Sequence, residues 1–168
     1  RQVPAFDIAA ACSGFVYAMI SGACMMGPSH YRNVLVVGAE TMSSITDFED
    51  RATCVLLGDA AGAAVIAPAD NDVSGIYDHL LGADGSGAKM IWTPVNERLH
   101  YMKMRGRQVY RFAVTKFVEV LEGAVRRAGL TADDLAMVIP HQSNLRIIES
   151  AADKLGLPME RVAVNIDR

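Results

Sequence analysis

The sequence has 168 residues, of which 51% are hydrophobic and 21% charged, and its formal net charge is −3 at pH 7. This composition is typical of a folded globular chain and too apolar for a disordered one. The acidic balance, without a block of lysine and arginine, argues against binding of nucleic acid. Because no run of 18 apolar residues occurs, no membrane-spanning helix is predicted either.

The cysteines bear on the cellular compartment of the protein. Cys12, Cys24 and Cys54 are too few and too irregularly spaced for a disulfide framework or a metal site. No signal peptide pattern precedes them, so we expect reduced thiols and a cytoplasmic protein.

The chain begins at Arg1 and ends at Arg168 beside apolar sequence, whereas natural termini usually lie in polar segments. We therefore expect a piece of a longer chain, truncated at both ends.

The first part of the chain predicts an order of strand, helix, strand. Apolar, β-prone runs at residues 5–10 and 34–38 predict two strands. The segment between them predicts a helix that Cys12 opens and Gly27 closes. A third β-prone run, at residues 63–67, predicts another strand.

The middle of the chain predicts a boundary and a loop. The polar run at residues 70–72 is the best candidate for a division into two halves, residues 1–69 and residues 70–168. The glycine-rich residues 82–88 predict a flexible loop. That loop lacks the Gly-Lys-Ser/Thr ending of a phosphate-binding loop, so we do not interpret it as one.

The last part predicts two amphipathic helices, which end at Gly129 and Gly156. Their inward positions are predicted to be Val114, Phe117, Val118, Leu121, Val125 and Ala128 in the first helix, and Leu145, Ile148, Ala152 and Leu155 in the second. Residues 131–134 predict a capped turn between them, and residues 137–140 and 161–166 predict strands. Strands that alternate with helices indicate an α/β fold with largely parallel pairing.

Two segments repeat one pattern. Cys12 and His141 each follow an apolar run and open a predicted helix, and each precedes the glycine that closes its helix by 15 residues. The next predicted strands begin 22 residues after Cys12 and 21 residues after His141. The pattern, without residue identity, is consistent with two duplicated halves.

Cys12 is a candidate nucleophile. The unpaired N–H groups and the partial positive charge at a helix N-terminus favour the thiolate form of a cysteine, and Gly14 leaves room for a substrate beside the sulfur. A free cysteine is more often a small buried hydrophobe, so position alone leaves both roles open. Cys24 and Cys54 follow no such turn and are interpreted as structural.

His141 is the candidate partner of that cysteine. It follows an apolar strand, and ligands collect at the carboxyl ends of strands in α/β folds. Its imidazole could donate a hydrogen bond to a substrate carbonyl or take a proton from it. The alternative is a helix-capping or core-edge histidine. Two pseudo-symmetric halves would bring their strand ends together, which makes a pair of Cys12 and His141 plausible.

Four segments resemble the β-ketoacyl-acyl-carrier-protein synthase III family of thiolase-like condensing enzymes. They are residues 7–15 around Cys12, residues 50–63, the histidine motif at residues 140–146, and residues 164–168, which resemble the strand before the family's catalytic asparagine. The matches follow the family's order over essentially the whole chain. The resemblance implies a five-layered αβαβα thiolase-like fold with duplicated halves, here truncated at both ends.

The resemblance also implies an activity, the decarboxylative condensation of an acyl-coenzyme A (acyl-CoA) primer with malonyl-acyl-carrier protein, which begins type II fatty acid synthesis. Cys12 would be the nucleophile that accepts the acyl group, and His141 would act in decarboxylation and condensation. The coenzyme A thioester is a substrate, and no cofactor or metal is expected. The family's catalytic asparagine lies beyond an Asp-Arg pair such as Asp167-Arg168, so Asn165 is not that residue. We therefore expect an acyltransferase of this type that is incomplete as this chain alone.

Four further residues take roles from the resemblance. Arg51 would contact the nucleotide of coenzyme A, and Gly106 would lie along the pantetheine tunnel. Asn144 would lie near the coenzyme A or malonyl thioester, and Arg146 would help to dock the acidic carrier protein. The family also implies a homodimer.

Three alternatives remain open at this point. The chain could come from a related condensing enzyme of secondary metabolism or an acyltransferase with the same cysteine and histidine. It could be a catalytically incomplete fragment that acts only as a binding or dimerisation module. A cysteine hydrolase would need the same nucleophile together with an activated water.

Overall fold

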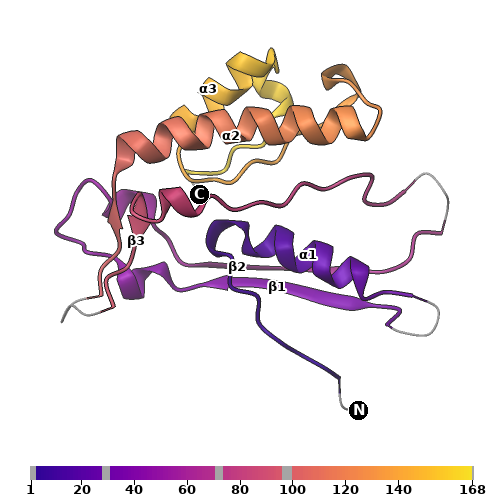
Figure 1. The fold of residues 1–168 in the computed structure, drawn as a ribbon, viewed down its shortest axis with the longest axis horizontal. Coiled ribbons are helices and arrows are strands. Elements are labelled where there is room, and N and C mark those ends of the chain that lie inside the picture. Colours follow the sequence, from indigo (N-terminus) through magenta and orange to yellow (C-terminus); the bar gives the residue numbers. More distant parts are fainter. Residues whose placement is uncertain (1–2, 28–30, 71–73, 96–99, 168) are drawn as a thin grey trace. The chain divides into compact units, whose positions relative to one another are not determined.

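The computed structural model describes residues 3–27, 31–70, 74–95 and 100–167 (Figure 1). The chain divides into two compact units. Unit 1 consists of Arg1–Thr41 and Asp59–Leu81, and unit 2 consists of Met42–Gly58 and Gly82–Arg168.

Unit 1 contains one helix and a two-stranded sheet. Its elements are the 3₁₀ turn Ala11–Ser13, α1 (Gly14–Cys24), β1 (Val34–Glu40) and β2 (Ala60–Ile66). The strands are antiparallel, with a register that runs from Val34 opposite Ile66 to Glu40 opposite Ala60. The predicted helix and the predicted strands at residues 34–38 and 63–67 are confirmed, with ends that shift by a few residues.

Glycines let α1 lie close against one face of this sheet. A Cβ atom on Gly22 would come within 2.9 Å of Val34 Cγ1, and a Cβ atom on Gly38 would come within 3.3 Å of Phe15 Cδ2. Val36, between the two contacts on β1, is buried. The glycines at these two positions therefore set the distance between helix and sheet.

Two expectations for the strands are wrong. Residues 5–10 form no strand in the described part of the chain, because a strand needs a hydrogen-bonded neighbour and none pairs with them. The predicted largely parallel pairing is wrong for the two described sheets, which are antiparallel, and within the described residues it holds for the isolated bridges Met26–Tyr31 and Val138–Val162. Parallel neighbours need a long crossover, usually a helix, but the segment between β1 and β2 forms only the 3₁₀ turns Met42–Ile45 and Cys54–Leu56.

Unit 2 contains two long helices and short elements around them. In chain order these are the 3₁₀ turns Met42–Ile45, Cys54–Leu56 and Gly85–Gly87, β3 (Ile91–Trp92), β4 (Lys103–Met104), α2 (Gly106–Arg127), the 3₁₀ turn Ala132–Asp134, α3 (Leu145–Leu155) and the 3₁₀ turn Met159–Arg161. Strands β3 and β4 are antiparallel. The Met102 amide donates to the Ile45 carbonyl at 2.8 Å and so joins the segment Met42–Gly58 to the start of β4.

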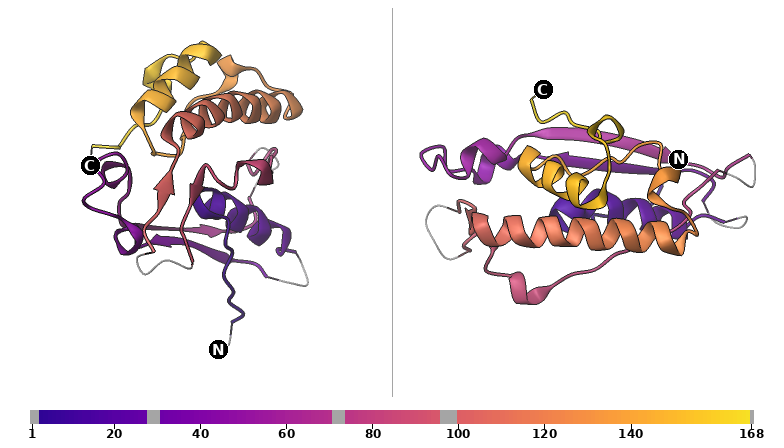
Figure 2. Two further views of the ribbon diagram at one scale, coloured as in Figure 1. Left: turned by 60° about the vertical axis from the view of Figure 1, so that its left-hand side comes forward. Right: turned by 90° about the horizontal axis from the view of Figure 1, so that it is seen from above.

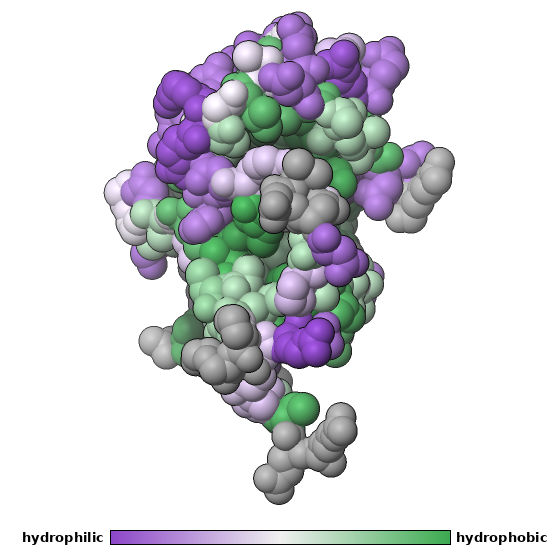
Figure 3. Space-filling view, turned by 90° about the vertical axis from the view of Figure 1, so that its right-hand side faces the viewer, coloured by the Kyte–Doolittle hydropathy of each residue, from purple (hydrophilic) through white to green (hydrophobic). Residues whose placement is uncertain are grey.

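α2 and α3 lie side by side over the core of this unit (Figure 2). The buried cluster consists of Val138, Ile148, Ala152, Leu157 and Val162, with Phe117, Leu121, Leu135 and Leu155 packed against it. The Tyr110 hydroxyl and the Ser150 hydroxyl, 2.6 Å apart, add a hydrogen bond between the two helices. Polar side chains cover the outer surface of these helices, which lies at the top of Figure 3.

Most predicted features of the two helices are confirmed. Gly129 and Gly156 follow the helix ends with φ angles of +72° and +64°, values that glycine adopts without a steric penalty. The capped turn is present, because the Asp134 carboxylate accepts hydrogen bonds from the Thr131 amide and hydroxyl at 2.8 and 2.7 Å. The inward position predicted for Leu145 is wrong. Leu145 is 40% exposed, because it begins α3 before the helix reaches the core.

The remaining expectations concern short segments. The predicted strands at residues 137–140 and 161–166 reduce to one parallel bridge between Val138 and Val162. The glycine-rich loop contains the 3₁₀ turn Gly85–Gly87, and the predicted boundary at residues 70–72 falls partly on Asn71 and Asp72, outside the described residues. Among the helices that the structure describes, none is long and apolar enough to cross a membrane.

Candidate functional site

Cys12 lies in the turn where the chain enters α1. It is the middle residue of the 3₁₀ turn Ala11–Ser13, and its side chain is exposed. The Ser13 amide donates to the Ala10 carbonyl at 3.1 Å, and Gly14 then begins the helix. The predicted position of the cysteine at a helix N-terminus is thus confirmed.

The residue before the cysteine has an unusual backbone. Ala11 has a φ angle of +46°, and it alone among the non-glycine residues of the described chain has a positive φ. An L-residue in this region costs roughly 1–2 kcal/mol, and such strain concentrates at functional sites. Sequence reasoning missed this feature, because an alanine gives no signal for a left-handed conformation.

The other residues near this turn leave space beside it. A Cβ atom on Gly14 would meet only the Ile8 carbonyl oxygen, at 3.9 Å, so the predicted open space is present within unit 1.

The other two cysteines lie elsewhere in the chain. Cys24 is exposed and Cys54 is half-buried. Their structural role stays a prediction.

His141 follows the parallel bridge of unit 2. It comes directly after the buried Pro140, and the residue as a whole is exposed. Desolvation nevertheless lowers the pKa of His141 below its ordinary value of 6.5, so part of the ring is withdrawn from water. A neutral imidazole can donate a hydrogen bond from one nitrogen and accept one at the other.

Asn144 caps α3. Its Oδ1 accepts a hydrogen bond from the Arg146 amide at 2.9 Å, which is the usual role of asparagine at a helix N-terminus. The cap does not use the Nδ2 group of Asn144, which is the group that could donate to a thioester carbonyl. Arg146 lies in the first turn of the helix, and it is exposed.

Arg51 lies on an exposed turn that its neighbours organise. The Asp50 carboxylate accepts from the Ala52 amide at 3.0 Å and from the Thr53 hydroxyl at 2.7 Å. These hydrogen bonds, the Thr53 one above all, lower the pKa of Asp50 below its usual value. The carboxylate therefore stays ionised and holds the turn that presents Arg51.

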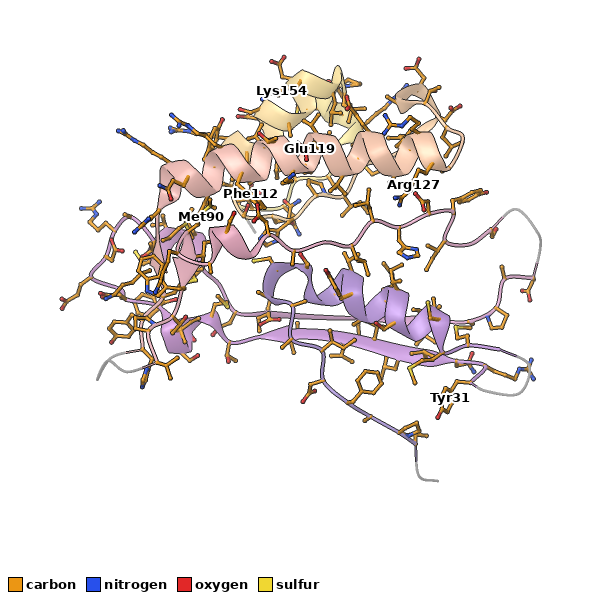
Figure 4. The ribbon with its side chains drawn as sticks, viewed as in Figure 1. Tyr31, Met90, Phe112, Glu119, Arg127 and Lys154 are labelled. Atoms are coloured by element: carbon orange, nitrogen blue, oxygen red, sulfur yellow. The ribbon has the colours of Figure 1, made fainter. Side chains whose placement is uncertain are left out.

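Gly106 is the first residue of α2. A Cβ atom there would meet no described atom within 4 Å, so the space around it is open within unit 2. The Arg105 amide donates to the Met90 carbonyl at 2.8 Å and anchors this end of the helix. An open hollow of about 350 Å³ borders the next turns of α2, and Met90 and Phe112, labelled in Figure 4, are among its lining residues. None of the predicted site residues lines it.

The structure brings some of the predicted site residues together. His141, Asn144 and Arg146 belong to one turn and the start of one helix, and Arg51 and Gly106 belong to other elements of the same unit. Cys12 belongs to unit 1, so its pairing with His141 stays a prediction. Sequence reasoning gave no role to Gln142, whose side chain forms one hydrogen bond within this turn and two with residues 163 and 165. Within the described ranges, no group of three histidine, cysteine or acidic residues could hold a metal ion.

Comparisons with known proteins cover both units. Residues 6–85 match the family model for 3-oxoacyl-(acyl-carrier-protein) synthase III, and residues 125–168 match the model for the C-terminal part of the same synthase. The words 3-oxoacyl and β-ketoacyl denote the same chemical group. A curated relative, the β-ketoacyl-(acyl-carrier-protein) synthase III of Staphylococcus saprophyticus, is 46% identical over 168 residues, which are 99% of this chain and 52% of the relative.

Solved structures give the same result. The β-ketoacyl-(acyl-carrier-protein) synthase III of Thermus thermophilus is similar with a TM-score of 0.91 and 43% identity, over 97% of this chain and 53% of that one. The priming β-ketosynthase of a polyketide biosynthetic pathway has a TM-score of 0.85 and 39% identity, over 96% of this chain and 50% of that one. The predicted family and the predicted α/β thiolase-like fold class are confirmed, and the chain spans about half the length of the relatives it matches.

Proposed function

The chain belongs to the 3-oxoacyl-(acyl-carrier-protein) synthase III family, and on this premise we propose that it serves the decarboxylative condensation of acyl-CoA with malonyl-acyl-carrier protein. The product is a β-ketoacyl-acyl-carrier protein, and the reaction begins type II fatty acid synthesis. The observation that carries the proposal is the exposed Cys12 on a strained turn at the start of α1. Cys24 is also exposed, but no such strained residue precedes it.

In the first step Cys12 is acylated. Its thiolate attacks the carbonyl carbon of acyl-CoA, a bond between carbon and the Cys12 sulfur forms, and the bond to the sulfur of coenzyme A breaks. The released thiolate of coenzyme A then takes up a proton. The helix N-terminus next to Cys12 presents backbone N–H groups and a partial positive charge to the site of attack.

In the second step the malonyl group loses carbon dioxide. The electron pair of the breaking carbon–carbon bond moves into an enolate, whose oxygen needs hydrogen-bond donors. A neutral His141 and the Nδ2 group of Asn144 suit this role, and the low pKa of His141 supports it. The enolate carbon then attacks the acyl carbonyl on Cys12, a carbon–carbon bond forms, and the sulfur of Cys12 leaves.

Other residues of unit 2 would bind the two substrates. We assign Arg51 to the nucleotide of coenzyme A, Gly106 to the pantetheine chain and Arg146 to the acidic carrier protein. The exposure of all three supports these assignments, since each contact must form with a molecule from solution. The proposal includes a cytoplasmic homodimer that needs no metal or cofactor.

A second candidate function rests on one comparison. The similarity to a polyketide priming β-ketosynthase favours a related condensing enzyme of secondary metabolism. Both enzymes would use Cys12 and His141 in the same way. They would differ in the acyl primer and in the carrier protein that receives the product.

An assay with acetyl-CoA, longer acyl-CoA esters and malonyl-acyl-carrier protein tests the proposal. We expect carbon dioxide release from the chain. A β-ketoacyl product, which mass spectrometry of the carrier protein detects, is expected where the family's catalytic asparagine is also supplied. Cys12→Ala should abolish the product, and His141→Ala should abolish decarboxylation while Cys12 is still acylated. Thioester hydrolysis without carbon–carbon bond formation would identify a cysteine hydrolase. Carrier-protein binding without acylation would identify a binding module.

A further inference from the structure

We propose that Gln142 is a positioning residue whose side-chain amide fixes the His141 turn to residues 163–165; this inference rests on the function proposed above. Gln142 Nε2 donates to the Pro140 carbonyl at 3.0 Å and to the Ala163 carbonyl at 3.0 Å. Its Oε1 accepts from the Asn165 amide at 2.9 Å. One half-buried side chain therefore bonds the residue before His141 and two positions on a segment more than twenty residues later.

The geometry of the parallel bridge explains why a side chain is needed there. The Val138 amide donates to the Arg161 carbonyl at 2.8 Å, and the Ala163 amide donates to the Val138 carbonyl at 2.9 Å. A parallel ladder would continue with an amide of residue 140 to the Ala163 carbonyl, and with the Asn165 amide to the carbonyl of residue 140. Residue 140 is a proline, which has no N–H group to donate.

The amide of Gln142 occupies the place of this missing ladder step. It donates to the Ala163 carbonyl in place of the absent proline N–H. It also lies between the Asn165 amide and the Pro140 carbonyl, accepting from the first and donating to the second. The bridge thus continues through a side chain, and the backbone can turn away at His141.

The orientation of this amide follows from its partners. Both Nε2 hydrogens point to carbonyl oxygens, and Oε1 faces an N–H group. The flipped amide would place its oxygen against two carbonyl oxygens and its NH₂ group against the Asn165 N–H. All three contacts would then be repulsive, so the sites on residues 140, 163 and 165 define one orientation.

This arrangement sets the place of the catalytic imidazole. His141 lies between Pro140 and Gln142, and the Gln142 amide bonds to the carbonyl on one side and to residues 163–165 on the other. The backbone of His141 has little freedom between these two points. Because a small misplacement of a catalytic group lowers the rate of the chemical step, loss of the amide should lower kcat and leave KM nearly unchanged.

Nuclear magnetic resonance on the complete chain tests the proposal without need of activity. The variant Gln142→Met keeps the length of the side chain and removes its hydrogen bonds, and Ser143→Ala is the control in the same turn. In Gln142→Met we expect the Asn165 amide to exchange at least about tenfold faster, because a hydrogen bond that protects it is lost. The imidazole resonances of His141 should shift or broaden, whereas the Ile148 amide in the core should stay as in the wild type. In Ser143→Ala both the exchange rate of the Asn165 amide and the imidazole resonances of His141 should stay close to the wild type.

A second variant separates the two parts of the network. Gln142→Glu keeps an oxygen for the Asn165 amide and loses both donors. Exchange at Asn165 should therefore lie between the wild-type and Gln142→Met values, with the His141 resonances still shifted. An Asn165 amide that exchanges in Gln142→Met as in the wild type would overturn the proposal, and so would unchanged His141 resonances after Asn165 has lost its protection.

The catalytic part is measured as decarboxylation of a malonyl thioester. We expect kcat to fall by about tenfold or more in Gln142→Met and KM to change by less than about twofold, since the chemical step depends on placement. An unchanged kcat in an active protein would contradict the positioning role. If the wild-type chain decarboxylates nothing, the proposed function fails, and the resonance data alone then decide the role of Gln142.

Discussion

Ala11 and Cys12 place a strained backbone directly before the candidate nucleophile. The positive φ of Ala11 is local to the turn that leads into α1. A residue held in this region has few other conformations that keep the turn intact, so the strain restricts where Cys12 can lie. Side-chain identity at position 11 therefore affects both stability and the position of the sulfur.

Substitutions of Ala11 test this restriction. Ala11→Val should destabilise the protein by more than about 1 kcal/mol, because β-branched residues rarely adopt a positive φ. Ala11→Gly relieves the strain but increases the freedom of the unfolded chain, so its stability should stay within about 1 kcal/mol of the wild type. Urea unfolding measures both changes. Equal stability of Ala11→Val and the wild type would show that the turn relaxes without cost.

His141 should make the stability depend on pH. The pKa of His141 in the folded chain lies below the unfolded value of 6.5, because the ring is partly desolvated. Between these two pKa values the unfolded chain binds more protons, so the free energy of unfolding rises with pH there. Stability is therefore lost as the pH falls through 6.5 toward the folded pKa, and above 6.5 it is unaffected by this group.

The measurement compares the wild type with His141→Gln. Urea unfolding at several pH values between about 5 and 8 should give a weaker loss of stability on acidification for the variant. Above neutral pH the difference between the two free energies of unfolding should stay constant. A wild-type stability that falls relative to the variant as the pH rises would contradict a lowered pKa.

At the scale of elements, α3 has a cap that is also a candidate binding group. Asn144 Oδ1 accepts from the Arg146 amide, and Nδ2 is free of that cap. Asn144→Ala should cost about 1 kcal/mol of stability, whereas Asn144→Asp keeps an acceptor oxygen and should be as stable as the wild type. Asn144→Asp nevertheless lacks the Nδ2 group that would donate a hydrogen bond to the thioester oxygen. We therefore expect its rate of decarboxylation to fall about 100-fold. An active Asn144→Asp variant would assign Asn144 to the cap alone.

The packing of α1 on its sheet gives a second prediction at this scale. Gly22→Ala would place a Cβ atom 2.9 Å from Val34 Cγ1, with Ile66 and Val36 side chains at 3.6 Å on the other sides. The crowding should destabilise the protein by about 1–3 kcal/mol, more than the helix propensity of alanine returns. Gly14→Ala at the start of the same helix meets only one atom, at 3.9 Å, and is the control. Thermal unfolding should rank Gly22→Ala clearly below Gly14→Ala.

The sequence predicted local elements better than their pairing. Apolar spacing and the glycines at positions 129 and 156 predicted α2 and α3 correctly, because these signals lie within the elements themselves. The antiparallel pairing of β1 and β2 depends on the segment between them, which forms short turns and no crossover helix in the described residues. The strand at residues 5–10 was predicted from the composition of that segment alone. A strand also needs a second segment to pair with, and composition does not show whether one is present.

At the scale of the whole molecule, family motifs predicted more than residue patterns did. The segments around Cys12 and His141 identified the family, which the comparisons confirm over both ends of the chain. The hydrogen bonds of Gln142 could not be predicted, because they join groups that lie far apart in the sequence. The strain at Ala11 could not be predicted either, because an alanine gives no signal for a positive φ. The assigned roles of Arg51, Gly106 and Arg146 remain predictions.

One face of β1 and β2 is apolar and exposed in this chain. Leu35, Val37 and Val65 are 65%, 56% and 67% exposed, on the side of the sheet away from α1. Sheet faces and edges of this kind favour association between molecules. Activity measurements should therefore be accompanied by a measurement of the state of association at the same concentration.

The proposed function depends on the transfer of an acyl group to Cys12, and intact-mass spectrometry detects this transfer. The chain is incubated with acetyl-, butyryl- and octanoyl-CoA beside a Cys12→Ala control, and circular dichroism verifies that both proteins are folded. We expect one acyl adduct per chain, and none in Cys12→Ala although Cys24 is also exposed. A folded wild-type chain without an adduct, or an adduct that persists in Cys12→Ala, would contradict it.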